Sequence, residues 1–388
     1  MDHRARLVAS PSDVLAVKVA CIVGARPNLV KMGALMSAMN AAPDFEPVLI
    51  HTGQHYDHNM SGLFFEQLGI QPPAYNLEVG SDTTTRQTAR IMVAVEPLLL
   101  ELRPDLVLVV GDVNSTLAVA LVASRLGLPL AHVDAGLRSF DRSMPEEVNR
   151  VLTDAISDFL FTTEPSGHAN LAREGVDSSK IFFVGNVMID SLLQHLETAR
   201  SLHVPEQFGL ARGEYALLTL HRPSNVDDAQ VLAGLVGCIV ELQSHLPVLF
   251  PVHPRTRERL AAAGLLERLA AAPRVTLTEP LGYLELMSVL ADARLVLTDS
   301  GGLQEETTIL GVPCLTLREN TERPITISHG TNRLVGSNPD RIRAAALDVL
   351  ATPRDPEVIR PELWDGAAAS RILDVLRTRA MSGNPKRA

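Results

Sequence analysis

The chain has 388 residues, which is long for a single hydrophobic core and suits two domains. Its 35 Lys and Arg residues against 45 Asp and Glu residues give a formal net charge of −10, which argues against a protein that binds nucleic acid through a basic face. No run of about 20 uncharged apolar residues is present, so we expect no membrane span. Three cysteines in apolar runs predict buried thiols and a reducing cytoplasm rather than a disulfide framework.

The N-terminal part of the chain predicts a short extension followed by a parallel sheet. Residues 1–16 lack the apolar core of a signal peptide, and we expect them to form a flexible extension. From Val17 onward, short apolar runs alternate with helix-length periodic segments, which is typical of βαβ units. The first strand, 17–23, leads to Arg26 and Lys31 at the start of a helix. Cations there oppose the helix dipole, so their placement indicates an anionic ligand.

The loop after the second predicted strand, 48–51, is rich in polar side chains. It contains Gln54, His55 and Asp57. The spacing of its histidines matches no zinc signature, so we expect no bound metal. We interpret this segment as a polar loop over an active-site cleft.

Carboxylates follow the next two predicted strands. Asp112 comes after strand 106–110, and Asp134 comes after strand 130–133. Functional residues of doubly wound sheets collect at such strand ends, although Asp112 could equally cap the following helix. Glu146 begins an amphipathic helix soon afterwards, where a capping role could also explain it. Because Arg26, Asp112 and Asp134 leave one sheet edge and Glu146 follows just after it, we expect these four charged groups to converge on one crevice.

The pattern of strands and helices restarts in the second half of the chain. Strands at 160–162 and 181–184 complete the first Rossmann-like domain, which we place at 17–190. We place the second domain at 191–388, with the linker ahead of its first strand. Apolar runs predict strands at 215–220, 248–252, 275–277, 295–297 and 313–317.

The fourth strand of the second half is followed by a tight turn with two glycines and a helix start. Such a turn directs unpaired N–H groups and the positive end of a helix dipole at whatever binds there. Ser300 adds a hydroxyl to Gly301 and Gly302, while Glu305 and Glu306 could reach the sugar hydroxyls of a nucleotide whose phosphate occupies the turn. The same residues could instead serve only as a helix cap and a turn.

Further cations follow the strands of the second half, together with a histidine. They are His221, Arg255, Arg318 and Arg323. The sequence therefore predicts an α/β fold of two Rossmann-like domains that face each other across a cleft. We expect a nucleoside diphosphate on one wall, its appended group presented to carboxylates on the other, and a last helix near 368–380 that packs back on the first domain.

The chain resembles the non-hydrolysing UDP-N-acetylglucosamine 2-epimerase family, which has GT-B architecture. The resemblance runs from Val17 to about Arg377 and rests on motifs in a fixed order: GARPNLVK, HTGQHYD, VGDVNSTLA, HVDAGLRS, MPEEVNR, LHRPSN, PVHPRTR, TDSGGLQEE and RENTERP. It implies a two-step reaction without a redox cofactor. The C2 proton is removed while UDP leaves from C1, and UDP then adds back to the 2-acetamidoglucal as a proton returns to the other face.

The resemblance also assigns roles to residues. It implies that Asp112, Asp134 and Glu146 are acid/base candidates, without deciding which one takes the proton. Lys31 matches a position near the active site, and His221 matches the partner of the departing phosphate. The residues predicted to bind the UDP-sugar are Arg26, Arg138, His221, Arg255, Ser300, Gly301, Gly302, Glu306, Arg318 and Arg323.

Two positions bear on how the chain differs from its family. The family usually has glutamate where this chain has Asp134. Gln54 and His55 lie in the loop with which some bacterial members bind a second UDP-sugar as an activator. The alternatives to UDP-N-acetylglucosamine epimerisation are an epimerase of a modified UDP-sugar such as a diacetamido-uronate, a hydrolase that releases N-acetylmannosamine, and a UDP-sugar-binding protein with weakened catalysis. The family leads us to expect a homodimer.

Overall fold

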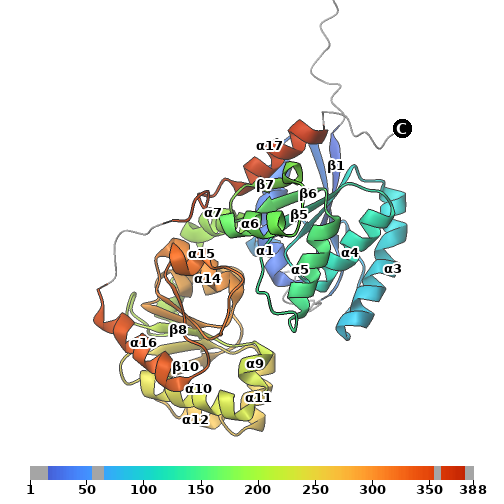
Figure 1. The fold of residues 1–388 in the computed structure, drawn as a ribbon. Helices are drawn as coiled ribbons and strands as arrows, with labels where there is room; N and C mark the ends of the chain where they lie inside the picture. Colours follow the sequence, from blue (N-terminus) through green and yellow to red (C-terminus); the bar gives the residue numbers. More distant parts are fainter. Residues whose placement is uncertain (1–15, 55–64, 354–359, 381–388) are drawn as a thin grey trace, which may run out of the picture.

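A computed structural model describes residues 16–54, 65–353 and 360–380. Two parallel β-sheets, each flanked by helices, form two lobes (Figure 1). The first sheet has the order β3-β2-β1-β4-β5-β6-β7, and the second has the order β10-β9-β8-β11-β12-β13. In each sheet the strand order runs outward in both directions from two central strands, β1 and β4 or β8 and β11. This is the strand order of a Rossmann fold. The predicted pair of Rossmann-like domains is therefore confirmed.

The strands of the first sheet form where the chain carries apolar runs that are covered on both faces. The five residues of β4, LVLVV, are all buried, as in most strands of a sheet with helices on both sides. The strands are β1 (Val17–Val23), β2 (Phe45–His51), β3 (Tyr75–Asn76), β4 (Leu106–Val110), β5 (Leu130–Ala135), β6 (Phe159–Thr162) and β7 (Ile181–Phe183).

The second sheet contains β8 (Ala216–Thr219), β9 (Val248–Pro251), β10 (Val275–Thr278), β11 (Leu295–Thr298), β12 (Cys314–Thr316) and β13 (Asn332–Leu334). The helices up to the second sheet are α1 (Arg26–Asn40), α3 (Thr84–Leu102), α4 (Asn114–Arg125), α5 (Pro145–Ile156), α6 (Pro165–Arg173), α7 (Val187–Ser201) and α8 (Val204–Gln207). The later helices are α9 (Pro223–Val226), α10 (Ala229–Leu242), α11 (Pro254–Ala262), α12 (Leu266–Ala270), α13 (Tyr283–Ala291), α14 (Gly301–Leu310), α15 (Ile325–Ser328), α16 (Pro339–Ala351) and α17 (Ala368–Ala380).

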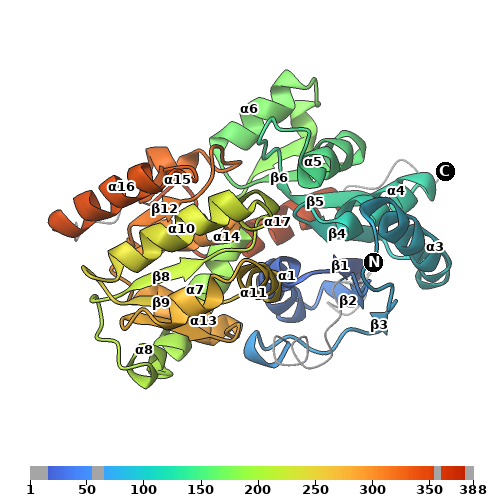
Figure 2. The same ribbon diagram turned by 90° about the horizontal axis from the view of Figure 1, so that it is seen from below.

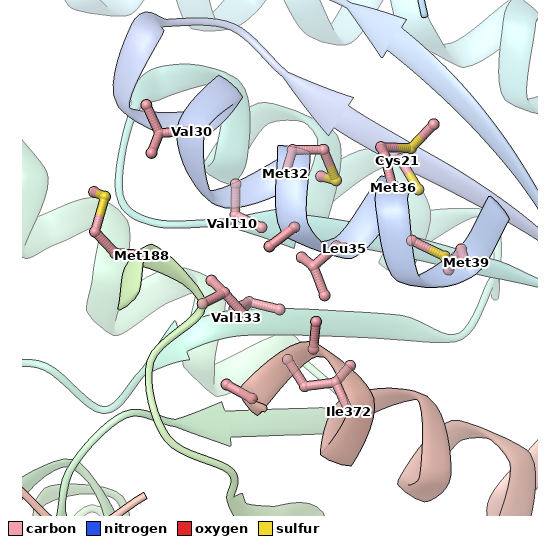
Figure 3. Packing of buried hydrophobic residues seen from close by; sticks show 14 of the residues in the cluster. Cys21, Val30, Met32, Leu35, Met36, Met39, Val110, Val133, Met188 and Ile372 are labelled. Atoms are coloured by element: carbon pink, nitrogen blue, oxygen red, sulfur yellow. The ribbon is translucent and has the colours of Figure 1, made fainter. Parts of the chain in front are cut away.

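The largest apolar core of the described residues lies on one face of the first sheet and includes residues from β1 to α17. Figure 3 shows Met32 and Leu35 of α1 close to Val133 of β5 and Ile372 of α17, all of which belong to one buried cluster. The same cluster includes Met287 of α13, so α7 and its neighbours connect the two lobes through apolar contacts.

The last helix returns to the first domain. Figure 1 shows α17, in red, beside the first sheet, and it packs against α1 and α7. The buried indole of Trp364 donates from Nε1 to the Thr163 carbonyl at 2.9 Å. Asp190 of α7 accepts from the amides of Ala368 and Ala369 at 3.1 and 2.7 Å, which caps the start of α17. The domain boundary predicted at residue 190 thus lies inside α7, a helix that contacts both lobes.

Within the described ranges, no helix has the length and apolar character needed to cross a membrane.

Candidate functional site

Each sheet reverses its strand order between two central strands, and the loops after these strands carry the candidate residues. In the first sheet the pair is β1 and β4; in the second it is β8 and β11. Ligands of open α/β sheets bind in the crevice outside the carboxyl ends of strands at this reversal. Lys31 and Asp112 follow the first pair, and His221 and Ser300 follow the second.

A buried ion pair joins two of the predicted catalytic residues. Nζ of Lys31 in α1 pairs with Oδ2 of Asp134 at the end of β5. The backbone of Asp134 is left-handed, with φ 70°, a conformation that aspartate adopts more readily than most residues. Burial by itself would raise the pKa of Asp134, but the charges of Lys31 and Arg323 hold that pKa below its ordinary value. Asp134 is therefore an ionised carboxylate.

Asp112 is held beside the helix that carries Glu146. Oδ2 of Asp112 lies 3.4 Å from Nη1 of Arg150 in α5, and the Asn149 amide donates to the Asp112 carbonyl at 2.8 Å. Asp112 and Glu146 are both only half-buried. The next residue, Glu147, is buried and accepts from the amides of Ser139 and Phe140 at 2.9 Å each. Glu147 thus has a structural role, whereas Asp112 and Glu146 remain accessible on the first domain.

Two predicted arginines of the second domain share one carboxylate. Arg318 Nη2 and Arg323 Nη1 lie 2.8 and 2.9 Å from the two oxygens of Glu322. Arg323 Nε also lies 2.6 Å from Oε1 of Glu305. Burial would raise the pKa of Glu322, but the two guanidinium groups hold it well below its usual range. The sequence reasoning missed Glu322, although its place between two arginines was a usable signal.

The candidate residues of the two domains face each other. The charge of Arg323 contributes to the lowered pKa of Asp134. Burial raises the pKa of Glu305, against the charges of Arg323 and of Lys31 in the first domain. Asn186, which caps α7, donates to Glu305 Oε1 at 2.8 Å. The structure therefore brings the predicted Asp134 of the first domain and the predicted Arg323 of the second together.

The predicted histidine is oriented by a carboxylate that the sequence reasoning missed. His221 Nδ1 lies 2.8 Å from Oδ1 of Asp299, which is fully buried directly after β11. Asp299 belongs to the motif TDSGGLQEE, but its position in the sequence does not predict a contact with the loop after β8. The imidazole of His221 is partly exposed.

The predicted phosphate turn opens α14. Ser300 is the N-cap residue, and its side chain makes no capping hydrogen bond within the helix. A Cβ at Gly301 would lie 2.7 Å from Glu322 Oε1, so the turn needs glycine at this position. Burial, followed by the charge of Glu305, raises the pKa of Glu306 to about 8. An uncharged carboxyl can donate as well as accept, which suits contact with hydroxyl groups.

A third buried carboxylate that the sequence did not predict is Glu164, at the start of α6. Burial raises its pKa to about 7, against the opposing effects of the Ser166 hydroxyl and the charge of Arg323. The Ile325 amide of the second domain is also a hydrogen-bond partner. No pattern around Glu164 in the sequence indicated this interdomain position.

Some predicted binding residues are engaged elsewhere. The buried Arg138 donates to both oxygens of Glu174 at 2.8 and 2.7 Å and pairs with Asp154 at 2.7 Å. Arg255 pairs on the surface with Asp227. Neither arginine contacts the cluster around Arg323 in the described part of the chain.

The predicted effector loop is described only in part. Oε1 of Gln54 accepts from the amide and hydroxyl of Ser115 at 2.9 and 2.7 Å, which holds the start of α4. His55 lies outside the described residues. Arg26 begins α1, but its side chain is also outside the described part of the structure. Among residues 16–54, 65–353 and 360–380, no group of three or more His, Cys, Asp or Glu side chains is placed to hold a metal ion.

Comparison with known proteins gives concordant matches over most of the chain. The profile of a family described as UDP-N-acetylglucosamine 2-epimerase matches residues 37–377. A UDP-N-acetylglucosamine 2-epimerase of Methanocaldococcus jannaschii is 43% identical over 365 residues, which cover 93% of this chain and 99% of that protein. A UDP-2,3-diacetamido-2,3-dideoxy-D-glucuronate 2-epimerase of Pseudomonas aeruginosa is 42% identical over 365 residues, with the same coverage of 93% and 99%.

Solved structures agree with the sequence matches. The crystal structure of the M. jannaschii UDP-GlcNAc 2-epimerase with UDP-GlcNAc and UDP has a TM-score of 0.87 at 43% identity, covering 93% of this chain and 100% of that one. The Neisseria meningitidis UDP-GlcNAc 2-epimerase bound to UDP-GlcNAc has a TM-score of 0.86 at 28% identity, with the same coverage of 93% and 100%. The similarity therefore extends over both domains.

Proposed function

Because the chain belongs to the UDP-N-acetylglucosamine 2-epimerase family, we propose that it interconverts UDP-N-acetylglucosamine and UDP-N-acetylmannosamine. Membership makes it an epimerase, and thus an isomerase. The observation that carries the proposal is the opposition of two sets of groups. The ionised Asp134 of the first domain lies within electrostatic reach of Arg323, which the second domain holds beside the start of α14.

We propose that the second domain holds the nucleotide. The diphosphate lies at the start of α14, where Ser300, Gly301 and Gly302 present backbone N–H groups, and Glu306 binds the ribose hydroxyls. Arg323, fixed between Glu305 and Glu322, supplies positive charge. Arg138 and Arg255 receive no part in this binding group, because carboxylates already engage their guanidinium groups.

The proposed chemistry begins with loss of the C2 proton to a carboxylate. The C–H electron pair forms the C1–C2 double bond, and the C1–O bond breaks with its electrons passing to the β-phosphate oxygen of UDP. Asp112 and Glu146 are the proposed proton carriers because they are accessible, and Arg150 places Asp112 beside α5, which carries Glu146 in its first turn. Asp134 stays ionised on Lys31 and orients that cation.

Proton NMR of the purified protein with UDP-N-acetylglucosamine in deuterated water tests the proposal. Deuterium at C2 together with accumulating UDP-N-acetylmannosamine is the expected result. Free N-acetylmannosamine with UDP would identify a hydrolase. Saturable UDP binding without exchange would refute epimerisation of this substrate.

A modified sugar is the second candidate substrate. It is favoured by the Pseudomonas aeruginosa diacetamido-glucuronate epimerase, which matches this chain at 42% identity, close to the 43% of the M. jannaschii protein. Parallel kcat/KM measurements with the two UDP-sugars separate the candidates. A higher value with the diacetamido-uronate would replace the primary assignment.

We also propose that the protein works as a homodimer in the cytoplasm. Support comes from exposed apolar side chains on α3 and α5, the two helices that flank α4 in Figure 1. They are Val93, Leu100, Val148 and Leu152. Light scattering after gel filtration is expected to give twice the 42.0 kDa chain mass. The double variant Leu100→Glu, Leu152→Glu is expected to shift the measured mass towards that of the monomer.

A further inference from the structure

Asp299 binds the loop that carries His221 through both of its oxygens. Oδ1 lies 2.8 Å from His221 Nδ1, while Oδ2 accepts from the amides of His221 and Arg222 at 3.0 and 2.9 Å. The Asn225 side chain donates to Oδ2 at 3.1 Å. Asp299 itself is fully buried. The carboxylate is therefore a fixed acceptor on one side of the imidazole.

The hydrogen-bond pattern determines which nitrogen of His221 carries a proton. Burial would raise the pKa of Asp299, but the hydrogen bond and charge of His221 and the backbone amides hold it below its ordinary value. An ionised carboxylate only accepts hydrogen bonds, so Nδ1 of His221 must be the donor. The other nitrogen, Nε2, is then the one available to a ligand.

We propose that Asp299 is a positioning residue that fixes the Nδ1–H tautomer of His221 and directs Nε2 at the diphosphate of the bound UDP-sugar. This inference rests on the proposed function. Asp299 directly precedes Ser300, the N-cap of α14, so the residue that holds the histidine also adjoins the proposed phosphate turn. A contact of 2.6 Å between the hydroxyls of Thr219 and Thr298 joins the two strand ends.

The orientation of the ring matters to the departing group. Because Nδ1–H stays on Asp299, a second proton can enter the ring only at Nε2. With that proton taken up from solvent when the diphosphate binds, Nε2–H donates to the β-phosphate oxygen that receives the C1–O electron pair. When UDP adds back, the oxygen returns that electron pair to C1 and the hydrogen bond is released. Carboxylates that orient imidazoles in this way support catalysis without themselves touching substrate.

The test compares the wild type with Asp299→Asn. Long-range proton–nitrogen NMR of histidine-labelled protein reads the tautomer directly, and we expect Nδ1–H in the wild type and Nε2–H in the variant. For UDP-N-acetylglucosamine, kcat is expected to fall on the order of a hundredfold while KM stays within about threefold. A purely structural loss would not produce this combination.

Two further variants make the test specific. Asn225→Ala removes a hydrogen bond to Oδ2 but leaves Oδ1 and Nδ1 together, so the wild-type tautomer is expected despite lower stability. Combining Asp299→Asn with His221→Gln is expected to cost no more than His221→Gln alone. Full additivity, or Nε2–H in the wild type, would overturn the inference.

The readouts also separate this inference from the proposed function. Absence of turnover by the wild type refutes the function, while the tautomer in the NMR spectrum still decides the role of Asp299. If Asp299→Asn fails to fold, the spectrum of the wild type decides alone.

Discussion

Lys31 and Asp134 form a buried ion pair across the first domain, and the pair is maintained with Asp134 in a left-handed backbone conformation. Removing two charges from water is costly, and a left-handed non-glycine residue adds strain. Both features are more typical of a functional site than of a stabilising contact. The pair fixes a cation and a carboxylate opposite Arg323 of the second domain.

Asp134→Glu is expected to reduce turnover on the order of a hundredfold and to leave UDP affinity unchanged. The longer side chain displaces Lys31, and glutamate tolerates φ 70° less well than aspartate. Steady-state kinetics and calorimetric titration with UDP check this. Asp134→Asn retains length and backbone tolerance, so it separates the effect of charge from that of geometry. Increased turnover in Asp134→Glu would instead identify a chain whose catalysis is weakened by the shorter residue.

Lys31→Met is expected to destabilise the protein by about 3 to 5 kcal/mol, because it leaves the Asp134 carboxylate buried without its partner. Adding Asp134→Asn removes the unpaired negative charge and should recover part of the lost unfolding free energy. Urea unfolding measures both. Lys180→Met is the matched control, since its ion pair with Asp158 is partly exposed and is expected to contribute at most about 1 kcal/mol. Equal losses at the two lysines would contradict the prediction.

Glu164 is expected to make stability fall as pH rises. Its pKa is about 7 in the folded protein against 4.5 for an ordinary glutamate, so the folded state binds the extra proton between these values and loses stability across that window. As the pH rises from about 5 to about 8, the wild type loses this stability and Glu164→Gln does not. The unfolding free energy of the variant should therefore increase by about 2 kcal/mol relative to that of the wild type. Urea unfolding at both pH values measures the difference. The exposed Glu197→Gln should show none of it.

Gly301→Ala is expected to cost about 1 to 3 kcal/mol of unfolding free energy without nucleotide. Its Cβ would approach Glu322 Oε1 to 2.7 Å and Arg323 Nη1 to 3.3 Å, and both atoms are fixed in buried ion pairs. At Gly302 a Cβ would only meet Met188 Cε at an ordinary 3.5 Å, so Gly302→Ala should not destabilise the free protein. Similar losses of unfolding free energy in the two variants would show that the Glu322 and Arg323 side chains can move aside at little cost.

The regular core of the fold follows from the sequence because its strands are buried on both faces. The predicted bounds of β1 and β4 coincide with the structure, since β4 is a continuous apolar run and β1 is interrupted only by Lys18 near its start. The edge strands β3 and β13 were not predicted. They have two and three residues and include Tyr75, Asn76 and Arg333, so no apolar pattern marks them.

The sequence predicts those site residues that directly follow a recognisable strand. Lys31 and Asp134 both follow predicted strands, and they do meet. Position at a strand end does not fix where a long side chain is directed, so the engagement of Arg138 by Glu174 could not be foreseen. Asp299 and Glu164 were missed because their partners come from distant segments, and only tertiary packing brings those segments together.

The return of α17 to the first domain affects how the protein is made. Ile372 and Leu376 of this helix belong to the core beneath α1, so the first domain to be translated lacks part of its interior until α17 has left the ribosome. The second domain has a separate core, within residues 216–349, and can complete it earlier. Synthesis therefore favours an inverted order, in which the domain that begins translation is the last to acquire its native packing.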